Sequence, residues 1–338
     1  MQGRTWAAVQ AGEELAPLEY PITQKTLALQ VVGNRDLFPY HHNGPFTRAL
    51  GLRDTFVNTT FYQGLFGRYS TDWAGPAAAV RSQRLTMSDQ LCPGDRAVVR
   101  GAVGRVWTEG ADHLVEVVAS IGHERGTTAR CTTVLALPPD PGTAVADREL
   151  PEPPAPVAAD DLPEFARADL GRPLHRDGPY PVSEAQIMYW CEMVRDAHPR
   201  YALDTDLPGG MIAPPQSLVM WGQPRATQMG LDPRHPDVEL PDQPAWPAPA
   251  ERFSFSFRAP DTTELIVQEV VCEFGTPLRP GDRVGVTYEL TGCSPLKQTK
   301  LGPGYFVTGR ETYRTRSGAI AGTCTMAMLQ YGVRTLVG

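Results

Sequence analysis

Two blocks of the chain alternate apolar and polar residues in the manner of antiparallel strands. The first block, residues 97–137, contains the runs AVVRGAVGRVW, HLVEVVASIG and ARCTTVLAL, separated by the turn sequences TEGAD and HERGTT. The second block, residues 282–330, contains DRVGVTYELTGC, YFVTGRETYRTRSG and AIAGTCTMAMLQ. β-branched runs bounded by turn residues predict three strands in each block.

The chain also repeats the features that precede these blocks. Pro-Gly-Asp stands before each of them, at 93–95 and at 280–282. Each half opens with apolar residues at near-helical spacing followed by Arg-Asp-x-x-Pro, in ITQKTLALQVVGNRDLFPYHHN and in VSEAQIMYWCEMVRDAHPRYAL. Ser183 is a suitable N-cap for the second of these helices. The pattern indicates an internal duplication.

A stretch rich in proline and acidic residues separates the two copies. It runs from Pro138 to about Pro181 and shows no apolar periodicity. Proline removes backbone donors and favours extended neighbours, so we predict a semi-rigid linker. The predicted domains are therefore 1–138 and 179–338, joined by a linker over 139–178.

Aligning the two copies pairs Asp36 with Asp196 and Pro39 with Pro199, but it pairs His41 with Tyr201. A phenol with a pKa near 10 is a poor base at neutral pH, which favours a structural role for Tyr201. The asymmetry predicts one working site, in the first half.

Composition and charge narrow the classes of protein. The chain has 338 residues, 41% of them hydrophobic, and a formal net charge of −7. Negative charge argues against a nucleic-acid or membrane-surface binder. No apolar run is long enough for a bilayer, and the N-terminus lacks a secretory signal, so we expect a cytoplasmic protein. The six scattered cysteines are expected to be reduced thiols.

Common catalytic and cofactor motifs do not occur in the sequence. We find no G-x-S-x-G, no P-loop and no G-x-G-x-x-G after a strand. The seven histidines show no metal-ligand spacing with cysteines. We therefore expect no metal and no redox cofactor.

The first Arg-Asp-x-x-Pro segment resembles the signature of the MaoC-like enoyl-CoA hydratases and dehydratases, Asp-x-Asn-Pro-x-His. Here it reads Asp36-Leu37-Phe38-Pro39-Tyr40-His41, with Phe38 in place of the asparagine. Together with FVNTTFYQGLFGRYSTDWAGP, it is similar to the small hydratase subunit that acts on CoA esters of steroid side chains. The second half, with MIAPPQSLVMW and LRPGDRV, is similar to the MaoC-type partner domain of such systems.

The resemblance implies an α+β double hotdog, in which each half is an antiparallel sheet wrapped around a central helix. A ligand would bind at the seam between the halves, and the hotdog domains could pair further in a homodimer. The partner would be an acyl-CoA or an acyl-carrier-protein thioester, with no other cofactor. The two prolines of IAPPQSL disfavour an intact central helix in the second half, which favours a bulky acyl group.

The resemblance also assigns site residues. Asp36 and His41 would hold and activate water; we assign His41 as the base and Asp36 as its partner, although the roles could be exchanged. The oxyanion donor would be a backbone N–H near Asn58 or Thr59, where the family's glycine is absent. Substrate contacts are expected at four side chains: Phe38, His42, Tyr62 and Arg68.

Three other readings stay open at this point. The chain could dehydrate a carrier-protein-bound substrate in polyketide-type biosynthesis. It could be a hotdog scaffold that catalyses another reaction, such as a cyclisation, since Phe38 and the missing glycine depart from the family pattern. It could also be a non-catalytic partner subunit of another hydratase.

Overall fold

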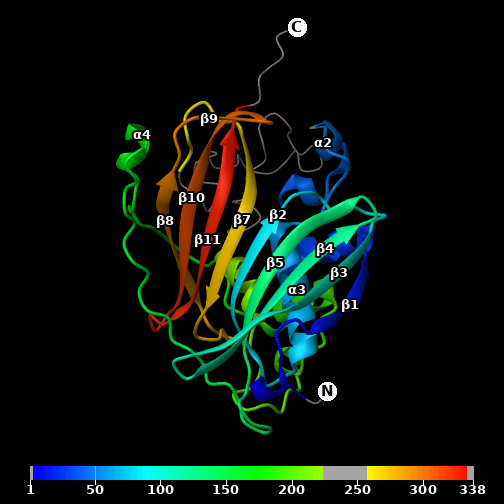
Figure 1. Cartoon of the computed structure of the whole chain (residues 1–338). Coiled ribbons are helices and arrows are strands. Elements are labelled where there is room, and N and C mark those ends of the chain that lie inside the picture. Colours follow the sequence, from blue (N-terminus) through cyan, green and yellow to red (C-terminus); the bar gives the residue numbers. More distant parts are fainter. Residues whose placement is uncertain (1–2, 50, 224–256, 333–338) are drawn as a thin grey trace.

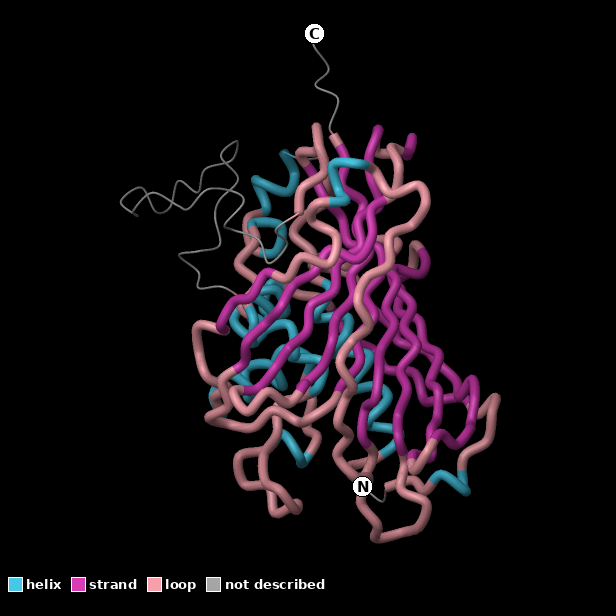
Figure 2. Tube along the Cα trace, turned by 90° about the vertical axis from the view of Figure 1, so that its left-hand side faces the viewer, coloured by secondary structure: helices cyan, strands magenta, loops and turns pink. Residues whose placement is uncertain are grey.

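The strands of the protein join into one curved sheet that crosses both halves of the chain. The computed structural model describes residues 3–49, 51–223 and 257–332. Within these residues, eleven antiparallel strands follow the order β1-β3-β4-β5-β2-β7-β11-β10-β8-β6, with β9 paired to β10. Figure 1 shows this continuous sheet, and in Figure 2 the strands curve around a central group of helices.

The first half contributes five neighbouring strands to the sheet, in the order β1-β3-β4-β5-β2, and one long helix. Helix α3 lies against the inner face of the sheet, where it contacts β5 and β2. The elements of this half are β1 (Glu14–Pro21), α1 (Gln24–Asn34), α2 (Gly44–Ala49), α3 (Thr59–Ala74), β2 (Ala79–Met87), β3 (Arg96–Glu109), β4 (Asp112–His123) and β5 (Gly126–Ala136).

The second half repeats the strand arrangement in mirror order along the sheet, which confirms the duplication seen in the sequence. Its elements are α4 (Glu164–Arg167), β6 (Leu174–Asp177), α5 (Glu184–Val194), α6 (Leu218–Gly222), β7 (Glu264–Phe274), β8 (Val284–Cys293), β9 (Lys297–Thr299), β10 (Gly302–Thr315) and β11 (Ile320–Tyr331). The predicted three-strand blocks correspond to β3, β4 and β5 in the first half and to β8, β10 and β11 in the second.

The two halves meet at the antiparallel pair β2 and β7, which the sequence analysis did not predict as strands. Ser82 lies opposite Glu273 at one end of this pair, and Thr86 lies opposite Glu269 at the other. Behind the strands, α1 packs on α5, where Gly33 lets the two backbones approach closely. A Cβ at Gly33 would lie 2.9 Å from the carbonyl oxygen of Tyr189.

The central helix differs between the halves. In the first half α3 has 16 residues, whereas its counterpart is the 3-10 turn Pro215–Ser217 followed by the five-residue α6. Proline has no N–H to donate and clashes with the preceding turn, so Pro214 and Pro215 delay the start of this helix. The expectation that the second half lacks an intact central helix is confirmed.

The connecting segment differs from its prediction near its end. Residues 174–177 form the short strand β6, which pairs with β8 and closes the far edge of the sheet. Before β6 in the chain, Glu152 forms a bidentate ion pair with Arg314 of β10, with N–O distances of 2.6 and 2.9 Å. This ion pair attaches the connecting segment to β10. The last residues of the predicted linker therefore belong to the part of the sheet formed by the second half.

Three further properties bear on the sequence expectations. All six cysteines are buried and free of disulfide bonds, as predicted. No helix in the described ranges is long and apolar enough to cross a membrane. Among the same residues, no three His, Cys, Asp or Glu side chains gather as a metal site would require.

Candidate active site

Asp36 and His41 face one another across a tight loop at the end of α1. The helix ends at Arg35, whose φ of 60° places it in the left-handed region and turns the chain sharply. The 3-10 turn Pro39–His41 then brings the imidazole back. As a result, Nε2 of His41 lies 3.3 Å from Oδ2 of Asp36, so the two side chains are in contact.

A backbone carbonyl fixes the orientation of the imidazole. Nδ1 of His41 lies 2.8 Å from the carbonyl oxygen of Phe56, and because a carbonyl only accepts, Nδ1 carries a proton. The other nitrogen, Nε2, is therefore the one that gains or loses a proton beside Asp36. His41 is buried, so the ring has little freedom to move.

The carboxylate of Asp36 is held by donors from two other segments. Its Oδ2 accepts a hydrogen bond of 2.7 Å from the side-chain amide of Asn58, and its Oδ1 accepts one of 3.3 Å from the N–H of Phe38. Asn58 is also the N-cap of α3, because its side-chain oxygen accepts from the N–H of Phe61. Asn34, at the end of α1, donates to that same oxygen at 2.9 Å.

These contacts shift the pKa values of the pair in opposite directions. Burial by itself would raise the pKa of Asp36, but the charge of His41 and the hydrogen bonds to the carboxylate outweigh it and hold the pKa below its usual value. Burial would lower the pKa of His41, but the charge of Asp36 and its hydrogen bond raise it above its usual value. The two residues thus favour a carboxylate beside an imidazolium.

Asn58 both caps a helix and holds Asp36, so its replacement by alanine is expected to have two effects. Loss of the cap lowers the free energy of unfolding by about 1 kcal/mol. Loss of the hydrogen bond to the carboxylate, worth about 1.5 kcal/mol, lowers turnover about tenfold. Urea unfolding and the hydration assay described below measure the two effects separately.

The matched control is Ser183→Ala. Ser183 caps α5 in the second half by accepting the N–H of Gln186, and none of the hydrogen bonds of Asp36 within the described residues comes from α5. This variant should lose similar stability and retain full turnover. Equal turnover in both alanine variants would contradict the role of Asn58 in positioning Asp36.

The two predicted oxyanion donors differ in their hydrogen bonds. The N–H of Asn58 already donates to Oε1 of Gln30 at 2.8 Å, so it is occupied within the protein. The N–H of Thr59 belongs to the first turn of α3, where backbone donors have no acceptor inside the helix. Of the two, Thr59 is the donor available to a ligand.

The four predicted substrate contacts are not equally placed. Phe38 is half-buried beside Asp36, and His42 is exposed, with Nε2 donating to the carbonyl of Leu37 at 3.0 Å. Tyr62 is only 2% exposed and its hydroxyl donates to the carbonyl of Asp89, which places it in the core. Arg68 pairs with Asp72 and donates to the carbonyl of Val194, which ties α3 to α5.

The sequence analysis missed the residues that support the pair: Gln30, Asn34 and Phe56, and the side chain of Asn58. They come from α1, from the segment before α3 and from its cap. One signal was available for Asn34, because it stands directly before the Arg-Asp dipeptide at the end of a predicted helix.

The second copy of the loop has the same backbone and different electrostatics. Arg195 ends α5 in the left-handed region, as Arg35 ends α1. Tyr201 stands in place of His41, and no cation pairs with Asp196 among the described residues, so burial raises the pKa of this carboxyl to about 6. Burial likewise lowers the pKa of His198 to about 4. Only the first copy stabilises a charged acid/base pair.

Comparison of folds identifies the architecture. No family model matches the chain. A MaoC domain protein of Chloroflexus aurantiacus superposes with a TM-score of 0.66 at 12% identity, covering 97% of this chain and 98% of that one. A conserved hypothetical protein of Mycobacterium tuberculosis, described as a double hotdog fold, superposes with a TM-score of 0.64 at 13% identity, covering 97% and 98%. The chain has the double hotdog fold of the MaoC-like dehydratases.

Similarity in sequence extends to hydratase subunits. One relative, named a probable enoyl-CoA hydratase alpha subunit of Thermomonospora curvata, is 26% identical over 52% of this chain and 53% of its own length. Another, the 3-oxo-4,17-pregnadiene-20-carboxyl-CoA hydratase beta subunit of Mycobacterium tuberculosis, is 36% identical over 22% of this chain and 58% of its own. The chain spans about half the length of the curated relatives it matches. These similarities confirm the resemblance to MaoC-like enoyl-CoA hydratases.

Proposed function

We propose that this double hotdog protein adds water to a 2-enoyl thioester, or removes it from the 3-hydroxyacyl thioester, at Asp36 and His41. The observation that carries the proposal is the pair itself, with Nε2 of the buried His41 3.3 Å from Oδ2 of the half-buried Asp36. Similarity to enoyl-CoA hydratase subunits supports a hydratase or dehydratase at the level of the family.

The pair supplies a base and an acid for the two proton transfers. In hydration, the oxygen of water bonds to the β-carbon while the α-carbon gains a proton. The pKa directions support Asp36 as the group that takes the proton from water and His41 as the group that delivers one to the α-carbon. This assignment exchanges the two roles expected from sequence, and dehydration uses the same groups in reverse.

Negative charge that develops on the thioester oxygen needs a donor close to the pair. The first turn of α3 begins directly after Asn58, whose side chain binds Asp36. We assign the N–H of Thr59 to this role, because the positive end of the helix dipole also favours an anion there. A backbone donor needs no particular side chain, so the absence of glycine is compatible with it.

The proposed substrate is a CoA ester with a bulky acyl group. The short α6 stands where a full central helix would fill the second half. One relative is named as a hydratase of a pregnadiene-carboxyl-CoA, which is a polycyclic thioester. The relatives are alpha and beta subunits, whereas this chain carries both hotdog halves in one polypeptide.

The pH dependence of kcat/KM for hydration follows from the two pKa shifts. Because the pKa of Asp36 is lowered, activity should fall only at a pH below the usual range of a carboxyl, as Asp36 gains a proton. Because the pKa of His41 is raised, activity should fall again only at a pH above the usual range of an imidazole, as His41 loses one. Because the charge of Asp36 raises the pKa of His41, Asp36→Asn should move the alkaline limb of its residual activity to lower pH. Asp196→Asn should leave the profile unchanged, and a rate that rises steadily from pH 7 to 9 would contradict the assignment.

The decisive experiment incubates the protein with short-chain, long-chain and polycyclic 2-enoyl-CoA esters. Mass spectrometry then detects a product heavier by one water. We expect hydration, fastest with the polycyclic ester. No hydration of any CoA ester would refute the proposal and favour a carrier-protein substrate, a cyclase or a partner subunit.

A further inference from the structure

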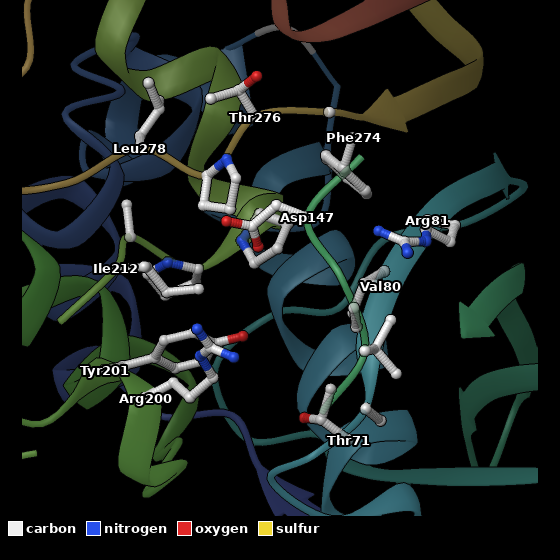
Figure 3. Close-up of a pocket in the computed structure, with 18 of the residues that line it drawn as sticks. Thr71, Val80, Arg81, Asp147, Arg200, Tyr201, Ile212, Phe274, Thr276 and Leu278 are labelled. Atoms are coloured by element: carbon white, nitrogen blue, oxygen red, sulfur yellow. The ribbon is translucent and has the colours of Figure 1, made fainter. Parts of the chain in front are cut away.

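A cavity lies at the second copy of the loop, beside the far end of the pair of strands β2 and β7. It is bordered by the start of β2, by the residues that follow β7, and by the turns on either side of Ile212. Figure 3 shows Tyr201 and Ile212 on one side of it, Val80 on the other, Leu278 above, and Asp147 of the connecting segment between them. Most of its lining is apolar.

The cavity is separate from Asp36 and His41. Tyr40 of the first loop contacts Glu264, the first residue of β7, whereas the cavity borders Phe274 at the far end of that strand. Asn58 caps the start of α3, and Thr71 near its end lines the cavity. At 1.5 Å per residue, α3 rises about 20 Å between these positions.

His198 presents a buried donor at this cavity. It is 4% exposed and stacks on Tyr201 with ring centroids 4.7 Å apart. The N–H of Arg200 donates to its Nδ1, so in the neutral ring the proton is on Nε2. Nε2 has no acceptor among the described residues. A buried donor without an acceptor is rare and costly, which points to a ligand oxygen as its partner.

The position of His198 strengthens this argument. The alignment of the two loops places it opposite Phe38, so the first copy has an aromatic ring without any polar atom at the corresponding position of the sequence. Packing alone would therefore be satisfied by phenylalanine. With its pKa lowered to about 4 by burial, the imidazole is neutral at pH 7 and acts only as a donor through Nε2.

The charges around the cavity are nearly balanced. The carboxylate of Asp147 lies 3.8 Å from the guanidinium of Arg279. Arg81 forms a bidentate ion pair with Asp112, with N–O distances of 2.7 and 2.8 Å. Arg200 lines the cavity and has no carboxylate partner in the described ranges. The imidazole N–H and this guanidinium are thus donors that a ligand could use.

We propose that this cavity binds an apolar molecule through an acceptor oxygen, which receives the Nε2–H of His198. A carbonyl oxygen and a carboxylate share this chemistry. A carboxylate would also pair with Arg200, whereas a ketone or ester would depend on the imidazole alone.

Titration calorimetry with 2-undecanone and with decanoate, on the full-length protein, tests the proposal. We expect one site per chain for at least one probe and about tenfold weaker binding to His198→Phe, which keeps the ring and removes the donor. Asp36→Asn should bind as the wild type does, because that change lies at the other end of the seam. Arg200→Gln distinguishes the carboxylate from the ketone. This variant should bind decanoate more weakly and should bind 2-undecanone with unchanged affinity.

Three results would overturn the proposal: neither probe binds, His198→Phe binds as tightly as the wild type, or Asp36→Asn loses binding equally. Circular dichroism checks that His198→Phe is folded. If it is not, Leu278→Trp gives an independent test, because a larger side chain at this position in the lining should exclude both probes. Undiminished binding to Leu278→Trp would place the ligand elsewhere.

Discussion

Hydration by His41→Ala is expected to fall about 10²–10⁴-fold in kcat, and hydration by Asp36→Asn by a similar factor. Each change removes one of the two groups that exchange protons with water and with the α-carbon. Because the two act as a unit, the double variant should lose little more than either single one. Rates of hydration of the best enoyl-CoA ester at saturating substrate provide the measurement.

The duplication supplies a matched control for this experiment. Asp196→Asn makes the same chemical change at the same position of the second loop, where Tyr201 replaces the histidine. It should retain full kcat. Robust hydration that survives both Asp36→Asn and His41→Ala would refute the assignment of the site, even if the protein proves to be a hydratase.

Trp190→Ala is expected to lower the free energy of unfolding by about 3–5 kcal/mol. Trp190 of α5 is 1% exposed and belongs to the apolar core that both halves share. Its ring reaches the central helix of the other half, since a Cβ at Gly64 would lie 3.2 Å from it. Truncation would therefore leave a large cavity at the contact between the halves.

Because this core is continuous, the halves should unfold together. We expect one cooperative transition for the wild type in urea, followed both by tryptophan fluorescence and by circular dichroism. Trp107→Ala, at a partly exposed tryptophan on β3 that stacks with Arg105, should cost much less. Two separate transitions in the wild type would show that the halves are independent domains.

Local sequence determined much of the fold. Alternation of β-branched residues identified six strands, and Ser183 marked the start of α5 because a side-chain oxygen is needed there to accept the N–H of Gln186. Repetition of Arg-Asp-x-x-Pro identified both loops. Each of these features depends on residues close together in the chain, so it can be read from the sequence.

The strands at the seam depend on distant partners. Arg81 and Gln83 of β2 are buried, a pattern that a polar-looking segment does not suggest. Arg81 is neutralised by Asp112 of β4, and Gln83 donates to the carbonyl of Gln63 and to Thr133. Since polar groups can be buried only when such partners exist, the burial of β2 follows from the tertiary structure.

By itself, the sequence determined that Asp36 and His41 share a loop and that the second loop has lost the histidine. Tertiary structure decided which nitrogen of His41 faces the carboxylate, through the carbonyl of Phe56. It also decided which protonation states are favoured, through the mutual charges of Asp36 and His41 and the hydrogen bond from Asn58. It also brought His198 to a cavity formed with β2 and the end of β7. Charge and hydrogen bonding at a site depend on atoms brought together by folding, and spacing along the chain does not specify them.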